Sequence, residues 1–183
     1  MNFRRLLVVS TILFIVCIAL GLLLPINIDL ESIAPFGDLV DDMDSFSSPV
    51  LFIIILINNL VAIFFVFIFS PILCITPILG IALNGLVIGV VGNMIIGEQG
   101  VLFLIAGILP HGIIEIPAVL IAFTAALNFG FATIKAVFKK QSRQKFVPSL
   151  VINGKYLALA AGMLVPAAFI EAFITPLILG LFK

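Results

Sequence analysis

Long apolar stretches, separated by short polar segments, make up most of this chain. A helix needs about 20 predominantly apolar residues to cross the hydrocarbon core of a bilayer. The pattern therefore predicts an all-α fold, a polytopic transmembrane helical bundle of about five spans. We expect one integral membrane domain over residues 1–183, with loops between its spans. The predicted spans are residues 6–24, 50–69, 72–96, 101–134 and 156–182.

The fourth apolar stretch is too long for one straight crossing. Residues 101–134 number 34, and a helix of that length extends about 51 Å, against about 30 Å for the hydrocarbon core. Pro110-His111-Gly112 is the expected place for a break, because a proline removes one backbone hydrogen bond inside a helix. Two arrangements remain open. In the first, residues 101–109 form a separate half-span or re-entrant piece. In the second, the whole segment is one long, kinked and tilted helix.

The composition places the chain in the bilayer. Hydrophobic residues make up 63% and charged residues 10% of the sequence, whereas soluble domains carry about 25% charged residues. The mean hydropathy is +1.42. The lipid bilayer is therefore the expected environment, and no nucleic-acid partner is expected for a chain with zero formal net charge.

The charges are segregated along the chain, and this predicts its orientation. Residues 25–49 hold six of the nine acidic residues and no Lys or Arg, whereas residues 135–155 are basic. Because positive loops stay in the cytoplasm, we expect an acidic outer loop and a basic cytoplasmic loop. The N-terminus with Arg4 and Arg5 is then cytoplasmic and the C-terminus outside, in a multi-pass plasma-membrane protein. The acid cluster is interpreted as a solvated loop, since its spacing does not match a calcium-binding loop.

Three glycines of the third apolar stretch share one helical face. Gly85, Gly89 and Gly92 follow one another at i, i+4 and i+7, and small residues at this spacing allow helix backbones to approach closely. The spacing predicts a helix-packing face, either inside the monomer or between copies of the chain. We expect a homo-oligomer formed through it.

Polar residues recur near the middle of four predicted spans. An ionisable group within a membrane span indicates a functional site, and convergence is the simplest way to satisfy such groups. His111 and Glu115, at i and i+4, would share one helix face. The residues of this predicted polar centre are Asn58, Asn59, Asn84, His111, Glu115 and Glu171.

Three interpretations of the polar centre are open. The first is a buried hydrogen-bonded network that joins helices. The second is a permeation, proton-coupling or metal site. The third is a centre for hydrolysis. His111, Glu115 and Glu171 are weak candidates for a divalent metal, since they supply three ligands at most. Hydrolysis is not indicated, because the chain lacks the H-E-x-x-H and G-x-S-x-G motifs and has no Asp in any predicted span. Neither an enzymatic activity nor a cofactor is expected.

Several motifs resemble the stage II sporulation protein M family of small polytopic membrane proteins. They are Asn58-Asn59, Asn84-Gly85 and the block Pro110-His111-Gly112 followed by Glu115-Ile116-Pro117-Ala118. The family's named member is a scaffold for cell-wall-degrading proteins during engulfment, and members also occur in non-sporulating organisms, including archaea. The resemblance implies a non-enzymatic membrane scaffold or assembly component with a membrane or cell-wall protein partner. The alternative is an ion-, proton- or metal-coupled transporter or channel that uses His111, Glu115 and Glu171.

Overall fold

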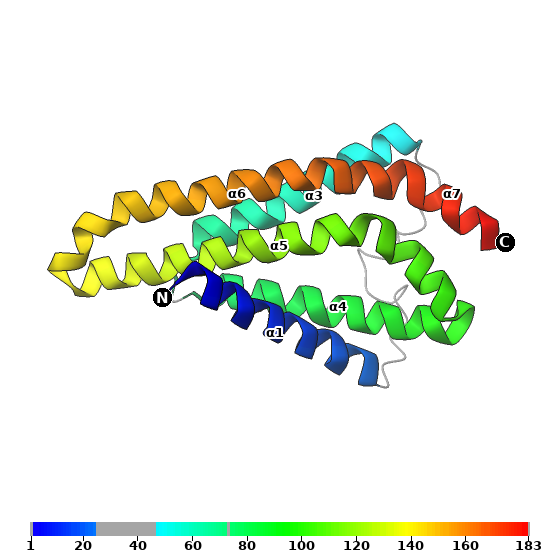
Figure 1. The fold of residues 1–183 in the computed structure, drawn as a ribbon, viewed down its shortest axis with the longest axis horizontal. Coiled ribbons are helices and arrows are strands. Elements are labelled where there is room, and N and C mark those ends of the chain that lie inside the picture. Colours follow the sequence, from blue (N-terminus) through cyan, green and yellow to red (C-terminus); the bar gives the residue numbers. More distant parts are fainter. Residues whose placement is uncertain (1, 25–46, 73, 183) are drawn as a thin grey trace.

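A computed structural model describes residues 2–24, 47–72 and 74–182, and this part of the chain is helical with no strand (Figure 1). The all-α prediction is confirmed, and within these described ranges five helices are long and apolar enough to cross a membrane. The predicted acidic loop lies almost entirely outside the described residues. The elements are α1 (Phe3–Leu23), α3 (Ser48–Phe69), α4 (Ile75–Gln99), α5 (Val101–Phe138), η2 (Lys140–Lys145), α6 (Phe146–Phe169), η3 (Ile170–Ile174), α7 (Thr175–Leu179) and η4 (Gly180–Phe182).

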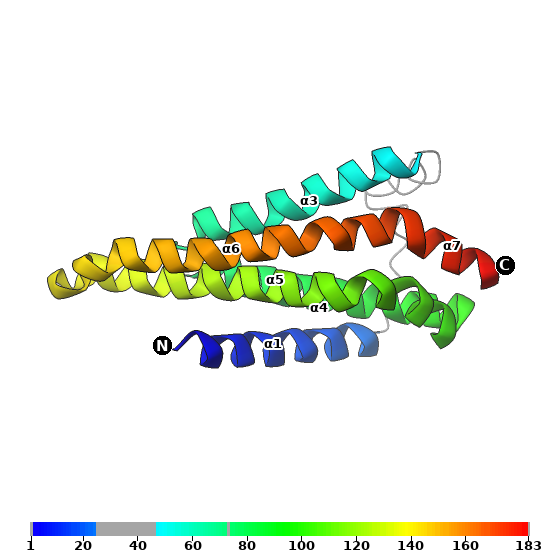
Figure 2. The ribbon, with the colours of Figure 1, turned by 45° about the horizontal axis from the view of Figure 1, so that its top comes forward.

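Helix α5 lies at the centre of the bundle. The pair α1 and α4 packs on one side of it, and α3 and α6 lie on the other (Figure 2). The N-terminus and the turn between α5 and α6 lie at one end of the bundle, whereas the C-terminus lies at the opposite end (Figure 1). The successive helices alternate in direction, as expected for a chain that crosses a bilayer repeatedly.

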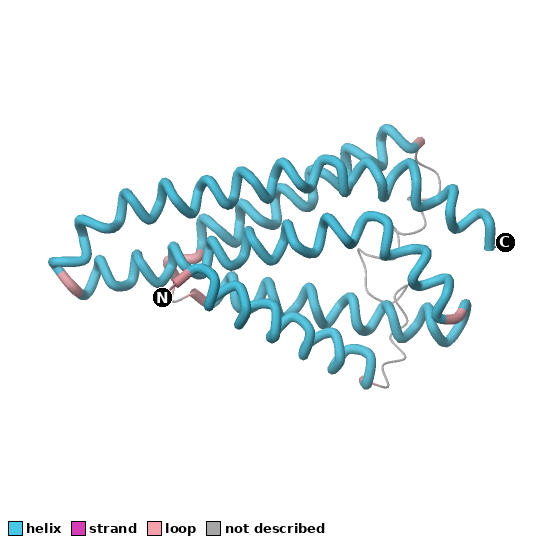
Figure 3. The backbone as a smooth tube through the Cα atoms, viewed as in Figure 1, coloured by secondary structure: helices cyan, strands magenta, loops and turns pink. Residues whose placement is uncertain are grey.

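Helix α5 continues through both of its internal prolines, Pro110 and Pro117. Its first turns run at an angle to the remainder, so the helix bends without ending (Figure 3). Of the two arrangements left open by the sequence, the structure has the long, kinked helix. A proline removes one backbone hydrogen bond and displaces the preceding turn, and packing against helices on both sides of α5 maintains the remaining helix.

The basic segment is a tight helical hairpin instead of the loop predicted over residues 135–155. Helix α5 extends to Phe138, the short 3₁₀ helix η2 follows, and α6 begins at Phe146 instead of residue 156. The fall in hydropathy after residue 134 marks the end of the apolar run, but helix α5 continues beyond it to Phe138. Lysine, arginine and glutamine favour helices in water, so α5 and α6 continue past their apolar parts.

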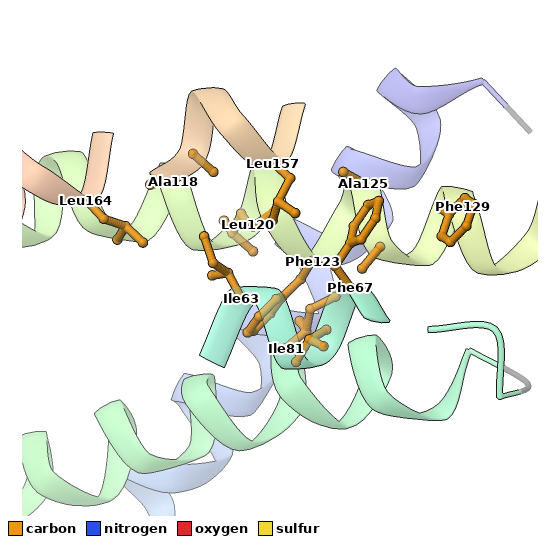
Figure 4. Packing of buried hydrophobic residues seen from close by; sticks show 14 of the residues in the cluster. Ile63, Phe67, Ile81, Ala118, Leu120, Phe123, Ala125, Phe129, Leu157 and Leu164 are labelled. Atoms are coloured by element: carbon orange, nitrogen blue, oxygen red, sulfur yellow. The ribbon is translucent and has the colours of Figure 1, made fainter. Parts of the chain in front are cut away.

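The main hydrophobic core lies where α5 meets α3, α4 and α6 (Figure 4). Phe123 is 2% exposed, and Phe67 stacks on Phe129 with ring centroids 5.1 Å apart. Small residues on α5 and α6, including Ala118, Ala122 and Ala160, are fully buried. They let these two helices approach closely along most of α6.

The glycines of α4 pack against α1 within the same chain. A Cβ atom on Gly85 would lie 2.6 Å from the carbonyl oxygen of Phe14. One on Gly89 would overlap the carbonyl oxygen of Ile18 and lie 2.8 Å from the Cα of Gly21. Gly92 is less tightly packed, with its nearest neighbours at 3.6 Å. This glycine face is therefore occupied inside the monomer, and association between copies needs another surface.

Candidate functional site

A cavity of about 450 Å³ lies among α1, α3, α4, α5 and η3, and we call it the central cavity. Its apolar lining includes Phe14, Val87 and Ile116. Its polar lining consists of Asn58, Asn84, His111, Glu115 and Glu171. These residues come from four elements, α3, α4, α5 and η3.

The two carboxylates and the imidazole form the most concentrated group in this cavity. One potential ligand atom from each of His111, Glu115 and Glu171 lies within 4.8 Å of the others. The Nε2 atom of His111 lies 3.9 Å from Oε2 of Glu115, one helical turn along α5. All three residues are partly buried, so the group is accessible from the cavity but surrounded by protein.

A wide helical turn positions Glu171. Residues Ile170–Ile174 form a π-helix, in which the backbone N–H of Thr175 donates to the carbonyl of Ile170. Pro176 has no N–H to continue the ordinary α pattern. The extra residue in this turn changes the direction of the side chains that follow. Single π turns are frequent at functional sites.

Hydrogen bonds join the polar centre to neighbouring helices. Asn59 Nδ2 on α3 donates to Oε1 of Glu115 at 3.0 Å. The hydroxyl of Thr175 donates to the carbonyl of Ile170 at 3.3 Å, and His111 Nδ1 lies 3.4 Å from the same hydroxyl. The hydroxyl has a single hydrogen, so when Thr175 donates it to Ile170, a protonated His111 Nδ1 is the donor to Thr175. In neutral His111, Nε2 then presents its lone pair towards Glu115.

Asn58 and Asn84 lie at the rim of the central cavity, and both side chains are exposed. The amide of Asn84 donates to the carbonyl of Gly80 in its own helix at 2.8 Å. The structure thus brings together all six residues of the predicted polar centre: five line the cavity, and Asn59 bonds to Glu115.

Two further polar features were not anticipated as site residues. Thr175 contacts His111, and its neighbour Pro176 is a sequence signal for the altered helical turn. A second polar cluster joins Asn128 of α5 to Asn153 of α6 by a hydrogen bond of 3.1 Å. Residue 153 fell in the predicted loop, so its burial inside a helix pair could not be foreseen.

The long apolar helices define a multi-pass helical membrane protein. The chain belongs to the stage II sporulation protein M family, whose model matches residues 10–176. It is also 30% identical, over 123 residues, to an uncharacterized protein of Methanocaldococcus jannaschii, an alignment that covers 67% of this chain and 69% of that protein. No solved structure shows a significant match.

Proposed function

We propose that this protein is a non-enzymatic membrane scaffold or assembly component that self-associates through the face formed by α3 and α4. Apart from its polar centre, the lining of the central cavity is apolar and includes Leu83, Ile108 and Val119. Besides the amides of Asn58 and Asn84 at the rim, an ion entering this cavity would meet polar side chains only at His111, Glu115 and Glu171. This lining favours an assembly role over a continuous permeation path.

The exposed amides of Asn58 and Asn84 carry the proposal. Both lie near the middle of membrane-spanning helices and at the rim of the central cavity, so their exposed parts face the cavity, lipid or a second protein surface. An amide offers both donors and acceptors, so the same surface on a second copy is self-complementary. Hydrogen bonds between membrane helices contribute about 0.6–2 kcal/mol each. Two copies joined here would therefore pair the amide of Asn58 and the part of the Asn84 amide that its bond to Gly80 does not use.

Replacing both Asn58 and Asn84 with leucine should shift the protein from dimer to monomer. Leucine preserves membrane insertion and removes the amide groups, so association should weaken at least about tenfold if each amide contributes about 1 kcal/mol. The measurement is energy transfer between labelled copies in liposomes as the protein is diluted. Asn93→Leu is the matched control in α4, because Asn93 bonds to the carbonyl of Leu24 and does not line the cavity. An unchanged dilution curve for the double variant would rule out this interface.

A cation-coupled function is the second candidate, because the potential ligands of His111, Glu115 and Glu171 lie within 4.8 Å of one another. His111 Nε2 lies 3.9 Å from Oε2 of Glu115, and in the tautomer protonated at Nδ1 it carries a free lone pair. Imidazole and carboxylate suit zinc and similar divalent ions.

Purified protein exposed to zinc and then desalted should retain stoichiometric metal if this second function holds. Glu171→Gln should lose most of the metal, because an amide is a poorer zinc ligand than a carboxylate. Glu98→Gln is the matched control, since Glu98 is exposed at the end of α4. Elemental analysis of the three proteins gives the result. Wild-type protein without metal, or equal loss from both variants, would eliminate the zinc site.

The charge pattern supports a proposed orientation in the plasma membrane. The start of α1, which carries Arg4 and Arg5, and the basic turn between α5 and α6 lie at one end of the bundle (Figure 1). Positive segments are retained in the cytoplasm, so this end is proposed to be cytoplasmic and the C-terminus outside. A membrane or cell-wall protein partner would bind the assembled scaffold.

A further inference from the structure

A second polar cavity, of about 490 Å³, lies between the end of α5, η2 and the start of α6. We call it the hairpin cavity. The segments that line it belong to the α5–α6 turn, at one end of the bundle (Figure 1), and none of its lining residues lines the central cavity. Its polar lining consists of Asn128, Lys135, Lys139, Ser142, Lys145 and Ser149. We propose that the hairpin cavity binds a phosphate-bearing anion, supplied by a phospholipid head group or by a free phosphorylated molecule.

The charge of this cavity is positive and is not balanced by neighbouring acids. Lys135, Lys139 and Lys145 contribute three ammonium groups. The sequence contains no Asp or Glu between residues 116 and 170. Across the part of the chain that the structure describes, no carboxylate lies within 4.0 Å of these lysines. Three like charges around one cavity repel one another, and a bound anion would relieve that repulsion.

A directed series of hydrogen bonds joins two lining residues of the hairpin cavity, Asn128 and Ser149, through the buried Asn153. Asn128 Nδ2 donates to Oδ1 of Asn153, and Asn153 Nδ2 donates to Oγ of Ser149 at 3.1 Å. Asn153 is completely buried, so its orientation is fixed by these partners. Ser149 accepts from Asn153 and keeps its own hydrogen to donate. This series of hydrogen bonds therefore ends at the Ser149 hydroxyl, a donor that lines the hairpin cavity.

These donors suit phosphate better than a smaller or less charged anion. A phosphate group offers several acceptor oxygens, and lysine is a common phosphate ligand. The hydroxyls of Ser142 and Ser149 add neutral donors beside the ammonium groups. Basic pockets between membrane helices on the cytoplasmic side bind lipid head groups. Phe131 and Ala132 continue the lining as an apolar wall, against which an acyl chain can pack.

The test titrates the full-length protein, in neutral detergent, with three probes. These are dioctanoyl phosphatidic acid, inorganic phosphate and uncharged dioctanoylglycerol, followed by native mass spectrometry and by the midpoint of thermal unfolding. We expect phosphatidic acid to bind and to raise the midpoint, and dioctanoylglycerol to do neither. Binding of inorganic phosphate at similar concentrations would identify a free phosphate as the source. Binding of phosphatidic acid alone would identify the lipid head group.

Paired variants separate this site from general surface charge. Lys139→Gln/Lys145→Gln should weaken phosphatidic acid binding by about tenfold or more, since each lysine near an anionic lipid contributes substantially. Lys140→Gln/Lys155→Gln removes the same charge from residues outside the cavity lining, and should leave binding within about twofold. Ser149→Ala should weaken binding without any change of charge. Equal losses in both lysine pairs, or no binding of either phosphate probe, would overturn the proposal.

Discussion

Replacing Gly89 with leucine should cause the largest loss of stability of any substitution considered for this protein. A side chain at this position meets the backbone of α1, with the carbonyl oxygen of Ile18 and the Cα of Gly21 inside normal contact distance. Backbone atoms cannot rotate away as a flexible side chain can, so α1 and α4 must separate. Overpacking costs about 1–3 kcal/mol and occasionally more, and we expect the upper end of this range.

The measurement is equilibrium unfolding of the detergent-solubilised protein by increasing SDS, followed by circular dichroism. Gly97→Leu is the matched control, because a Cβ atom on Gly97 would find no neighbour within 4 Å and the residue lies in the same helix. Its unfolding midpoint should stay close to that of the wild type. A wild-type midpoint for Gly89→Leu would mean that α1 does not pack against this face of α4.

Replacing Glu115 with leucine should cause the second largest effect. The amide of Asn59 would lose its acceptor within the bilayer, and a buried polar group left unpaired costs about 1–3 kcal/mol. Glu115→Gln keeps a side-chain oxygen at this position and should unfold close to the wild-type midpoint. The same SDS titration measures both variants. A loss in Glu115→Gln as large as in Glu115→Leu would contradict a purely hydrogen-bonded role and favour the cation-coupled alternative.

A double-mutant cycle assigns this loss to one contact. Asn59→Leu combined with Glu115→Leu should destabilise less than the sum of the two single substitutions, because both remove the same hydrogen bond. Asn84→Leu serves as the control partner, since the amide of Asn84 bonds to Gly80 within α4. The second cycle should be additive. Equal coupling in both cycles would show that the helices rearrange as a whole.

The apolar runs were sufficient to predict the helices that cross the membrane, because lipid forces each span to satisfy its own backbone. The same argument predicted that polar residues at one depth would converge, and the structure places Asn59 against Glu115. It also brings Glu171 from the last helix to His111 and Glu115. Depth along a helix can be read from sequence, since each residue adds a constant rise.

Other features depend on contacts that no local pattern encodes. Hydropathy could not decide whether α5 breaks at Pro110, because packing on both sides maintains the helix. Hydropathy also predicted a loop over residues 135–155, although α6 begins at Phe146. Charged residues mark where a span leaves the lipid, but a helix can continue beyond that point. The bond between Asn128 and Asn153 depends on how two helices rotate about each other. The glycine spacing predicted a packing face, but left its partner, α1, undetermined.

The central place of α5 has a consequence for the order in which the molecule is assembled during synthesis. Helix α1 emerges from the ribosome well before α4, the helix against which its Gly21 packs. Helix α3 has its main neighbours in α5 and α6, which are made later still. Chains are made from the N-terminus at about 5–20 residues per second. The first spans must therefore wait in the bilayer for seconds with their packing faces uncovered, until the C-terminal hairpin closes the bundle.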